Sequence, residues 1–238
     1  MERERREPTR CVVGRSVENE KLLQQGKWAN ADVYECTRCN RRLVRKEFFR
    51  KSLLVRWFIG RFLTWREARA LRRLEGLSGI PRLERRCSAC LCYAFIEGTP
   101  LGRLSRDQQL PKSYFLQAEA LLDSIHQRGL VHLDLRRGNN WIVQPDNTPG
   151  IIDFQTALVV DFLPCALREK LYAIDYSGLY KLWDKKCEEP LDARRAKLLE
   201  RVGRTRWLWV FRGYALQRVL NRVRQYETRS LSFDSSAE

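Results

Sequence analysis

The sequence predicts an α+β fold in which short antiparallel strands come first and helices follow. Residues 21–49 alternate brief apolar stretches with turn-forming residues, which is typical of a β-meander. Residues 65–75 and the stretch after Pro111 instead repeat apolar residues at helical spacing. Residues 97–100, Glu-Gly-Thr-Pro, have the composition of a connector. This order indicates a small strand-rich lobe followed by a mainly helical one.

The composition is that of a globular chain. It has 238 residues, of which 44% are apolar, so it can bury a sizeable core. The first residues are charged and lack the apolar stretch of a secretory signal. Arginines interrupt the longer hydrophobic runs, such as residues 54–63, which argues against a membrane-spanning helix. These features predict a cytoplasmic protein.

The net charge is strongly positive, because 45 Lys and Arg residues exceed 29 Asp and Glu residues and give +16. A field of this sign favours an anionic partner such as a phosphate-rich membrane, a nucleic acid or a polyphosphorylated ligand. Much of the charge can equally belong to solvated helix surfaces. Charge alone therefore does not identify the partner.

Eight cysteines include two close pairs, Cys36 with Cys39 and Cys87 with Cys90. Two such pairs can supply four thiolates to a tetrahedral zinc ion. The long stretch between the pairs differs from the compact spacing of a zinc finger, and free cysteine is a common buried apolar residue in a reducing compartment. Zinc binding and simple burial are both open for these cysteines.

Apolar pairs separated by turn residues predict the strands, because turn-forming residues end a strand and reverse the chain. Turns are expected around Gly26 and at residues 37–40, Thr-Arg-Cys-Asn. The expected strands contain residues 22–23, 33–34, 43–44, a short run around Leu83, and residues 91–96.

Two helices are expected on either side of the connector. Residues 64–67, Thr-Trp-Arg-Glu, have the form of a capping box, and helical spacing continues to Gly76, which predicts a helix over about 65–75. Pro111 is suited to the start of a second helix, which runs up to Gly129. Its apolar face contains Phe115, Ala118, Leu122 and Ile125.

The composition also suggests the domain boundaries. Residues 1–10 are charged and residues 229–238 are mostly small and polar, so both ends are expected to be disordered. The connector divides the rest into an N-terminal lobe, residues 11–97, and a C-terminal lobe, residues 98–228. Helices expected late in the second lobe are residues 191–202 and about 207–226.

The densest polar pattern lies in residues 130–143. They read Leu-Val-His-Leu-Asp-Leu-Arg-Arg-Gly-Asn-Asn-Trp-Ile-Val, and Ile-Ile-Asp-Phe follows at 151–154. The two segments have the form H-x-D-x-x-x-x-N followed by D-F. A turn rich in Asp and Asn can carry such residues merely to satisfy its backbone, but the combined pattern goes beyond what a turn requires.

This pattern resembles the protein-kinase-like superfamily, most closely its small bacterial lipopolysaccharide core sugar kinases and the related RIO-like kinases. The resemblance covers roughly residues 20–180. It implies a bilobal protein-kinase-like fold, with a small antiparallel β lobe that includes one helix and a mainly helical second lobe. It also implies a transferase that uses ATP and Mg²⁺, with the nucleotide bound between the lobes.

The resemblance assigns roles to the polar residues of the two motifs. Asp134 matches the catalytic-loop aspartate, which accepts or orients the proton of the acceptor hydroxyl. Asn139 and Asp153 match the Mg²⁺ ligands, although Asn140 beside Asn139 leaves the amide ligand open. Arg136 stands where protein-serine kinases carry a lysine, and we expect it to neutralise charge on the transferred phosphate.

Two residues of the first lobe resemble the ion pair of the kinase fold. Lys46, at the end of an apolar strand, matches the lysine that contacts the α and β phosphates, and Glu67 matches the acid that orients it. A chain this basic offers many lysines, and Glu67 can also be the acid of its capping box. His126 and His132 are expected to have structural roles.

The remaining nucleotide-binding residues match less closely. The phosphate-covering loop is expected around Gly26, where the kinase pattern has three glycines and this chain has one. Small residues in a tight turn can still cradle phosphate, and a pseudokinase is the alternative. Residues 93–98 resemble the hinge between the lobes, where the backbones of Ala94 and Ile96 are expected to bind adenine.

Two features bear on the acceptor. The chain after Asp153 lacks an Ala-Pro-Glu motif and lacks room for a peptide-binding subdomain, which argues against ordinary protein substrates. Residues 204–214 mix arginine with aromatic residues and suit a membrane interface, although a buried helix with a basic outer face fits equally. We expect peripheral membrane contact only if the first interpretation holds.

The favoured function, which rests on the family resemblance, is ATP-dependent phosphorylation of an inner-core lipopolysaccharide sugar, Kdo or heptose. Its acceptor would be an anionic glycolipid at the cytoplasmic face of the inner membrane. One alternative is a RIO-like serine/threonine protein kinase that binds ribosomal RNA or protein through its basic surface. The other is a non-catalytic, nucleotide-binding pseudokinase adaptor.

Overall fold

The computed structural model describes residues 18–26, 30–53, 55–105 and 107–204. The chain divides into two compact units, one ending at Leu191 and the other beginning at Asp192. In the second unit, the described residues form a helix over residues 193–204, close to the expected 191–202. The helix expected at 207–226 and both expected disordered ends lie outside the described residues. No helix in the described ranges is long and apolar enough to cross a bilayer.

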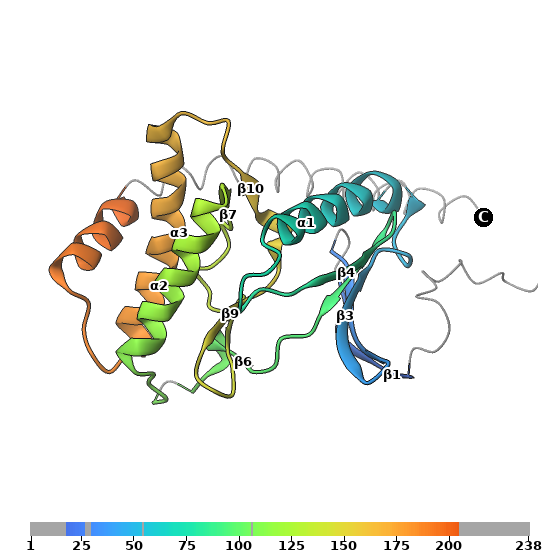
Figure 1. The fold of residues 1–238 in the computed structure, drawn as a ribbon, viewed down its shortest axis with the longest axis horizontal. Coiled ribbons are helices and arrows are strands. Elements are labelled where there is room, and N and C mark those ends of the chain that lie inside the picture. The colour runs from blue at the N-terminus through green and yellow to red at the C-terminus, as the bar shows by residue number, and fades with distance from the viewer. Residues whose placement is uncertain (1–17, 27–29, 54, 106, 205–238) are drawn as a thin grey trace, which may run out of the picture. The chain divides into compact units, whose positions relative to one another are not determined.

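The first unit begins with a five-stranded antiparallel sheet, which confirms the expected strand-rich lobe (Figure 1). Its order is β1-β2-β3-β5-β4, so the fifth strand is inserted beside the third. Cys39 and Asn40 form the tight β2–β3 turn with positive φ angles of 47° and 60°, as a two-residue hairpin requires. The strands are β1 (Glu18–Gln24), β2 (Asp32–Arg38), β3 (Arg41–Glu47), β4 (Leu83–Arg86) and β5 (Cys90–Ala94).

This hairpin geometry argues against the zinc hypothesis. Cys39 lies exposed at the turn, whereas Cys36 and Cys90 are buried within their strands. Among the residues that the structure describes, no group of three or more His, Cys, Asp or Glu side chains is placed to hold a metal ion. Burial therefore accounts for Cys36 and Cys90 without a metal.

The helix of the first lobe starts earlier than the sequence pattern predicted. A π-helical turn, Val55–Gly60, leads directly into α1 (Arg61–Arg73). Thr64 is therefore inside the helix, and its hydroxyl donates to the Gly60 carbonyl at 2.8 Å instead of capping the first turn. The capping-box interpretation was wrong. Glu67 does not cap the helix but faces the sheet, where it is buried.

The second lobe is built around two adjacent helices, α2 (Lys112–Gln127) and α3 (Cys165–Lys186) (Figure 1). Aromatic stacking joins them, because the Phe115 and Trp183 rings lie 5.3 Å apart. The predicted start of α2 after Pro111 is confirmed. Short elements between the helices are β6 (Thr99–Pro100), η2 (Leu101–Arg103), β7 (Leu130–Val131), β8 (Trp141–Val143), β9 (Pro149–Ile151), η3 (Phe154–Thr156) and β10 (Leu158–Val159).

The long helix α3 had no clear amphipathic pattern in the sequence, and its structure explains why. Its buried residues occur on several sides, from Leu171 through Leu179 and Tyr180 to Trp183. A helix that is buried on several sides lacks the single apolar stripe on which helix prediction depends.

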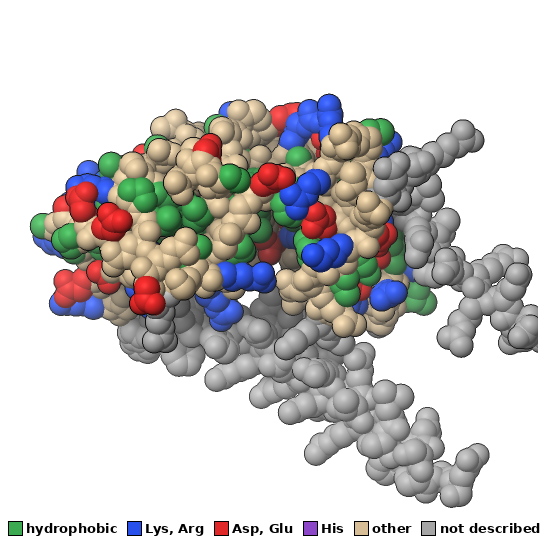
Figure 2. Space-filling model, turned by 90° about the horizontal axis from the view of Figure 1, so that it is seen from below, with side chains coloured by type: hydrophobic (Ala, Val, Ile, Leu, Met, Phe, Trp, Pro, Cys, Tyr) green, Lys and Arg blue, Asp and Glu red, His purple; other side chains and the backbone are tan. Residues whose placement is uncertain are grey.

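On the face of the molecule drawn in Figure 2, basic and acidic side chains are intermixed. This is the pattern expected if much of the positive charge belongs to solvated surfaces.

Candidate active site

The loop between β7 and β8 is held in place by Asp175 of α3. This carboxylate is almost fully buried, at 1% exposure, and accepts hydrogen bonds from the backbone N–H groups of His132 and Leu133, both at 2.7 Å. Leu133 has a φ of 68°, which a branched residue rarely adopts. The two hydrogen bonds hold that strained backbone in place, so Asp175 positions the loop that carries Asp134.

His132 connects this loop to the segment around Asp153. The ring is fully buried, and its Nδ1 accepts the Asp134 backbone N–H at 3.3 Å while Nε2 lies 3.1 Å from the Ile152 carbonyl oxygen. The neutral tautomer with its proton on Nε2 satisfies both contacts. The Thr156 hydroxyl donates to the His132 carbonyl at 2.8 Å. His132 thus has the structural role expected from the sequence.

His126 is also structural, as expected. It is buried, its Nε2 lies 3.2 Å from Asp175, and its ring stacks on Tyr172 with centroids 4.2 Å apart. These contacts join α2, which carries His126, to Asp175 and Tyr172 of α3.

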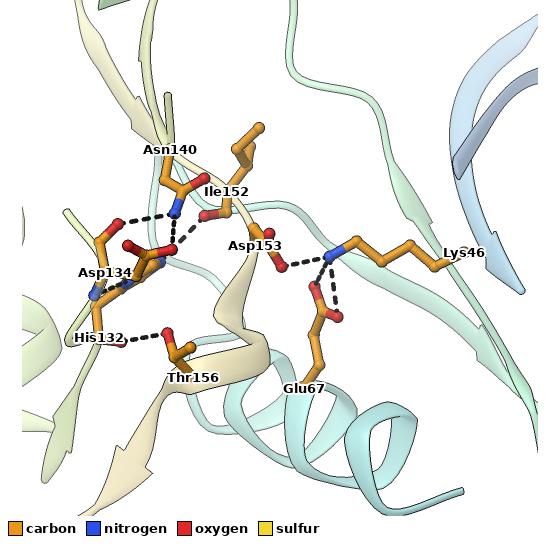
Figure 3. A network of polar contacts seen from close by, with 8 residues as sticks. All are labelled: Lys46, Glu67, His132, Asp134, Asn140, Ile152, Asp153 and Thr156. Carbon is orange, nitrogen blue, oxygen red and sulfur yellow. Dashed lines mark hydrogen bonds and ion pairs between the residues drawn. The ribbon is translucent and has the colours of Figure 1, made fainter. Parts of the chain in front are cut away.

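Asn140, rather than Asn139, contacts Asp134 (Figure 3). The Asn140 Nδ2 donates to the Asp134 carbonyl at 2.8 Å and to its carboxylate at 3.3 Å. Asn139 instead approaches Gly102, where a Cβ atom would lie 2.8 Å from its Oδ1. Asp134 and the asparagine that contacts it are therefore six residues apart, one more than the spacing expected from the sequence.

The carboxyl group of Asp134 is suited to receiving a proton. Loss of hydration raises the pKa of Asp134 above its ordinary value, although His132 acts in the opposite direction. The residue is exposed, so an acceptor can reach it from solvent. A raised pKa increases the proton affinity of the carboxylate, which favours general-base catalysis.

Lys46, Glu67 and Asp153 form a second polar cluster, in which β3, α1 and the segment after β9 meet (Figure 3). The Lys46 Nζ lies 2.8 Å from Glu67 Oε1 and 2.5 Å from Asp153 Oδ1. Burial alone would lower the pKa of Lys46, but the two carboxylates outweigh it and raise that pKa well above its ordinary value. Lys46 is therefore a permanent positive charge between two acids.

The two acids respond differently to the same lysine. Burial raises the pKa of Glu67 to about 7 despite the Lys46 charge. For Asp153, burial also acts to raise the pKa, but Lys46 outweighs it and the pKa is lowered. Asp153 is therefore ionised at neutral pH, as a metal ligand must be.

The residues around Asp153 fit a bound Mg²⁺ ion. Asp153 has a φ of 65°, a strained conformation of the kind found at functional sites, and its side chain is 40% exposed although Lys46 contacts it. The amide oxygen of Asn140 points away from Asp134 because its nitrogen makes both contacts there (Figure 3). A carboxylate and an amide oxygen are hard ligands, which Mg²⁺ prefers.

Arg66 ties α1 to the chain that follows Asp153. Its Nε donates to the Ala157 carbonyl at 2.8 Å and its Nη2 to the Thr156 carbonyl at 2.7 Å. The neighbouring Glu67 contacts Lys46, so one turn of α1 contacts both the strand that carries Lys46 and the segment after Asp153. Arg66 was not predicted from the sequence, because one arginine among many carries no distinguishing pattern.

The expected phosphate-covering loop is only partly described, since residues 27–29 lie outside the described ranges. The Gly26 N–H donates to Asp32 at 2.8 Å, and the Gly26 carbonyl accepts from Lys51 at 2.7 Å. A Cβ atom at Gly26 would lie 2.2 Å from the Asn30 carbonyl oxygen. The close approach of the Asn30 backbone therefore requires glycine at position 26, and the Gly26 amide already donates within the fold.

The expected hinge follows β5. The Ala94 N–H donates to the Arg82 carbonyl at 2.8 Å, so it is not free to bind adenine. The prediction that the hinge backbone binds adenine therefore rests on the Ala94 carbonyl and on Ile96. A hollow of about 510 Å³ lies against these residues but includes neither Lys46 nor Asp153, so it is not the phosphate-binding part of a nucleotide site. It is lined by residues 79–82, 94–97 and 144–146.

Arg136 lies two residues after Asp134, and its backbone packs against α3. A Cβ atom at Gly178 would lie 3.2 Å from the Arg136 nitrogen, so the glycine permits this close approach. The predicted role of Arg136 toward a transferred phosphate stays a prediction.

No protein-family model matches this chain, and no curated protein matches it. Among solved structures, the Rio2 kinase from Chaetomium thermophilum is similar, with a TM-score of 0.57 and 15% identity over 77% of this chain and 63% of that one. Its ADP/Mg²⁺-phosphoaspartate complex has a TM-score of 0.55 at the same identity, over 77% of this chain and 61% of that one. The chain thus spans less than two thirds of these structures. The likeness shows that the fold is protein-kinase-like.

Proposed function

We propose that this chain is a phosphotransferase that moves the γ-phosphoryl group of ATP to a hydroxyl group. The observation that carries the proposal is the cluster in which Lys46 contacts both Glu67 and Asp153, at 2.8 and 2.5 Å. Residues from three separate elements converge there on one cation. Placing charges at a buried position costs desolvation free energy, and ionisable groups with strongly perturbed pKa values are concentrated at functional sites.

The first part of the mechanism is nucleotide binding. The Lys46 ammonium would bind the α and β phosphates, and Glu67 would hold its side chain in that direction. Asp153 and Asn140 would hold Mg²⁺, which neutralises the phosphate oxygens when bound. The backbones of Ala94 and Ile96 would bind adenine.

The second part is transfer. Asp134 would orient the acceptor hydroxyl in line with the γ-phosphate and receive its proton, while the acceptor oxygen forms the new bond to phosphorus. The bond between phosphorus and the bridging oxygen breaks, and ADP leaves with that electron pair. Arg136 would neutralise charge on the transferred group.

Two acceptors follow from different observations. The likeness to the Rio2 kinase supports a RIO-like kinase that phosphorylates a protein hydroxyl such as serine. The short connection from Asp153 to α3, which begins at Cys165, supports a smaller acceptor, because it leaves little chain for binding a peptide. An inner-core lipopolysaccharide sugar is our candidate for that smaller acceptor, at the cytoplasmic face of a membrane.

The test is transfer of label from γ-labelled ATP, with Mg²⁺, into separated protein and glycolipid fractions. Native chain is compared with the Asp134→Asn and Asp153→Asn variants. Label in the protein fraction that both variants lose supports the RIO-like function, and label in the glycolipid fraction supports the sugar kinase. Nucleotide binding with no transfer into either fraction would instead indicate the pseudokinase adaptor.

A further inference from the structure

An exposed apolar face runs along the start of the α1 segment. Phe58 is 72% exposed, Leu53 is 66% exposed and Trp57 is 56% exposed, and Phe62 and Trp65 continue the same face. Large exposed apolar side chains that adjoin one another mark an interaction site, whereas scattered ones do not. We call this the α1 outer face; it consists of Leu53, Trp57, Phe58, Arg61, Phe62, Trp65 and Arg69.

Packing of the core does not explain these residues. The core-facing side of the same segment contains Thr64, Glu67, Ala68 and Leu71, all buried, and Ile59 packs near Phe48. On the outer side, Trp57, Arg61, Trp65 and Arg69 follow one another at four-residue spacing, which places them on one helix face. The segment is therefore apolar on two sides, and only one of them is used by the fold.

The exposed charges of this face have a single sign, because Glu67, an acidic residue within its span, is buried on the core-facing side. Residues 48–66 contain Arg50, Lys51, Arg56, Arg61 and Arg66 and no acidic residue. The Arg61 guanidinium lies over Trp57 at 5.6 Å from the ring centroid, and Arg69 lies over Trp65 at 5.4 Å. Within the described part of the chain, neither Arg61 nor Arg69 has an ion-pair partner, so both charges are available to an anion.

We propose that the α1 outer face docks on an anionic lipid bilayer. Tryptophan rings prefer the headgroup depth of a bilayer, arginine binds lipid phosphate, and phenylalanine and leucine enter the acyl boundary. The overall charge of +16 adds long-range attraction to an anionic surface. This docking is independent of phosphotransfer and does not rest on the proposed function.

A lipid surface fits this face better than a single-stranded nucleic acid does. Bases bind by stacking on free aromatic faces, but one face of each of the Trp57 and Trp65 rings already lies against a guanidinium. The most exposed members, Phe58 and Leu53, are purely apolar, and Leu53 offers no ring for stacking. Burying Leu53 in a hydrocarbon boundary uses a side chain on which no base could stack.

The test is co-sedimentation of the full chain with vesicles of phosphatidylcholine alone or mixed with phosphatidylglycerol. The variant Trp57→Ser, Phe58→Ser, Phe62→Ser removes three exposed aromatic residues. The matched control is Phe162→Ser, since Phe162 is 79% exposed and lies before α3. Residues 204–214 are retained in every protein, so a loss of binding reports on the α1 outer face.

We expect the native chain and the Phe162→Ser variant to bind the anionic vesicles and to bind neutral ones more weakly. The triple variant should bind the anionic vesicles about tenfold or more weakly, because each aromatic side chain buries apolar area. A second variant, Arg61→Gln with Arg69→Gln, should weaken anionic binding and reduce its salt dependence. Thermal unfolding checks that both variants are folded.

Several outcomes would overturn the proposal. One is that the folded triple variant binds anionic vesicles as well as the native chain does, or that the native chain does not bind them. Another is that the triple variant loses binding to a single-stranded RNA oligomer or loses self-association while its vesicle binding is unchanged. The face would then serve a nucleic acid or a second copy of the chain.

Discussion

The ammonium group of Lys46 lies 2.5 Å from the carboxylate of Asp153, a residue 107 positions further along the chain. Lys46 comes from a strand of the first lobe and Asp153 from the segment after β9 in the second lobe. Glu67 holds the other side of the same ammonium group. This one cation therefore joins the two lobes at the place where we propose that ATP phosphates bind.

Phosphotransfer should depend on pH through Glu67. Its pKa is raised to about 7, so the carboxylate takes up a proton as the pH falls through that value and its attraction for Lys46 weakens. We expect the rate to fall from about pH 8 to pH 6 with a midpoint near 7. Glu67→Gln should lower the rate and flatten this part of the pH profile. An unchanged profile in Glu67→Gln would contradict the assignment.

The contribution of Glu67 to folding stability should have the opposite pH dependence, falling as the pH rises. The folded pKa of about 7 exceeds the ordinary value of 4.5, so the folded state binds more protons between these values. The contribution of Glu67 to stability is therefore present below pH 4.5 and is lost as the pH rises through 7. Urea unfolding of the native chain and Glu67→Gln across this range measures the difference.

Asn140 and Asn139 form a matched pair for testing the metal site. Asn140 contacts Asp134, whereas Asn139 approaches Gly102, so we propose Asn140 as the amide ligand that would share a metal ion with Asp153. Asn140→Ala should raise the Mg²⁺ concentration needed for half-maximal activity by about tenfold, since one oxygen ligand is lost. Asn139→Ala should shift it much less. A larger shift in Asn139→Ala would contradict this assignment and indicate Asn139 as the ligand, as the sequence spacing predicts.

Asp175 should be important for stability. Asp175→Asn replaces an oxygen by an NH₂ group opposite a backbone N–H of His132 or Leu133, so a buried donor loses its partner. We expect a loss of about 3 kcal/mol in the free energy of unfolding. Asp184→Asn, at an exposed position of the same helix, should change it by less than about 0.5 kcal/mol. Equal losses in the two variants would contradict this role.

Arg66 should act as a positioning residue for the segment after Asp153. Arg66→Ala removes the hydrogen bonds to the Thr156 and Ala157 carbonyls, which lets α1 and that segment move apart. We expect kcat to fall about tenfold with little change in the KM for a small acceptor. The exposed Arg72→Ala on the same helix is the control. A change confined to KM would indicate a direct contact with substrate instead.

The sequence was sufficient for the residues whose chemistry forms a local motif. Asp134 and Asp153 could be identified because each lies in a short pattern that a turn alone does not require, and the strands around Lys46 followed from turn residues. The protein-kinase-like fold that these patterns predicted is confirmed. The roles assigned to the residues stay predictions.

Other features depended on contacts that a sequence does not contain. Asp175 looks like a surface charge on a helix, and only the fold shows that the carboxylate is buried against the His132 loop. A hint existed, because Asp175 lies between Leu171 and Leu179 at core spacing. Which of Asn139 and Asn140 contacts Asp134 depends on the path of the loop backbone. The sequence spacing pointed to Asn139, whereas the structure brings Asn140, one residue later, to Asp134.

The most direct test of the central claim is the dissociation constant of Mg-ATP, measured by calorimetry for the native chain, Asp134→Asn and Asp153→Asn. We expect Asp153→Asn to weaken binding by about tenfold or more, because Asp153 is a proposed metal ligand. Asp134→Asn should bind nearly as tightly as the native chain, because we propose that Asp134 contacts the acceptor and not the nucleotide. Absence of Mg-ATP binding by the native chain, or equal binding by native and Asp153→Asn, would contradict the proposed phosphotransferase.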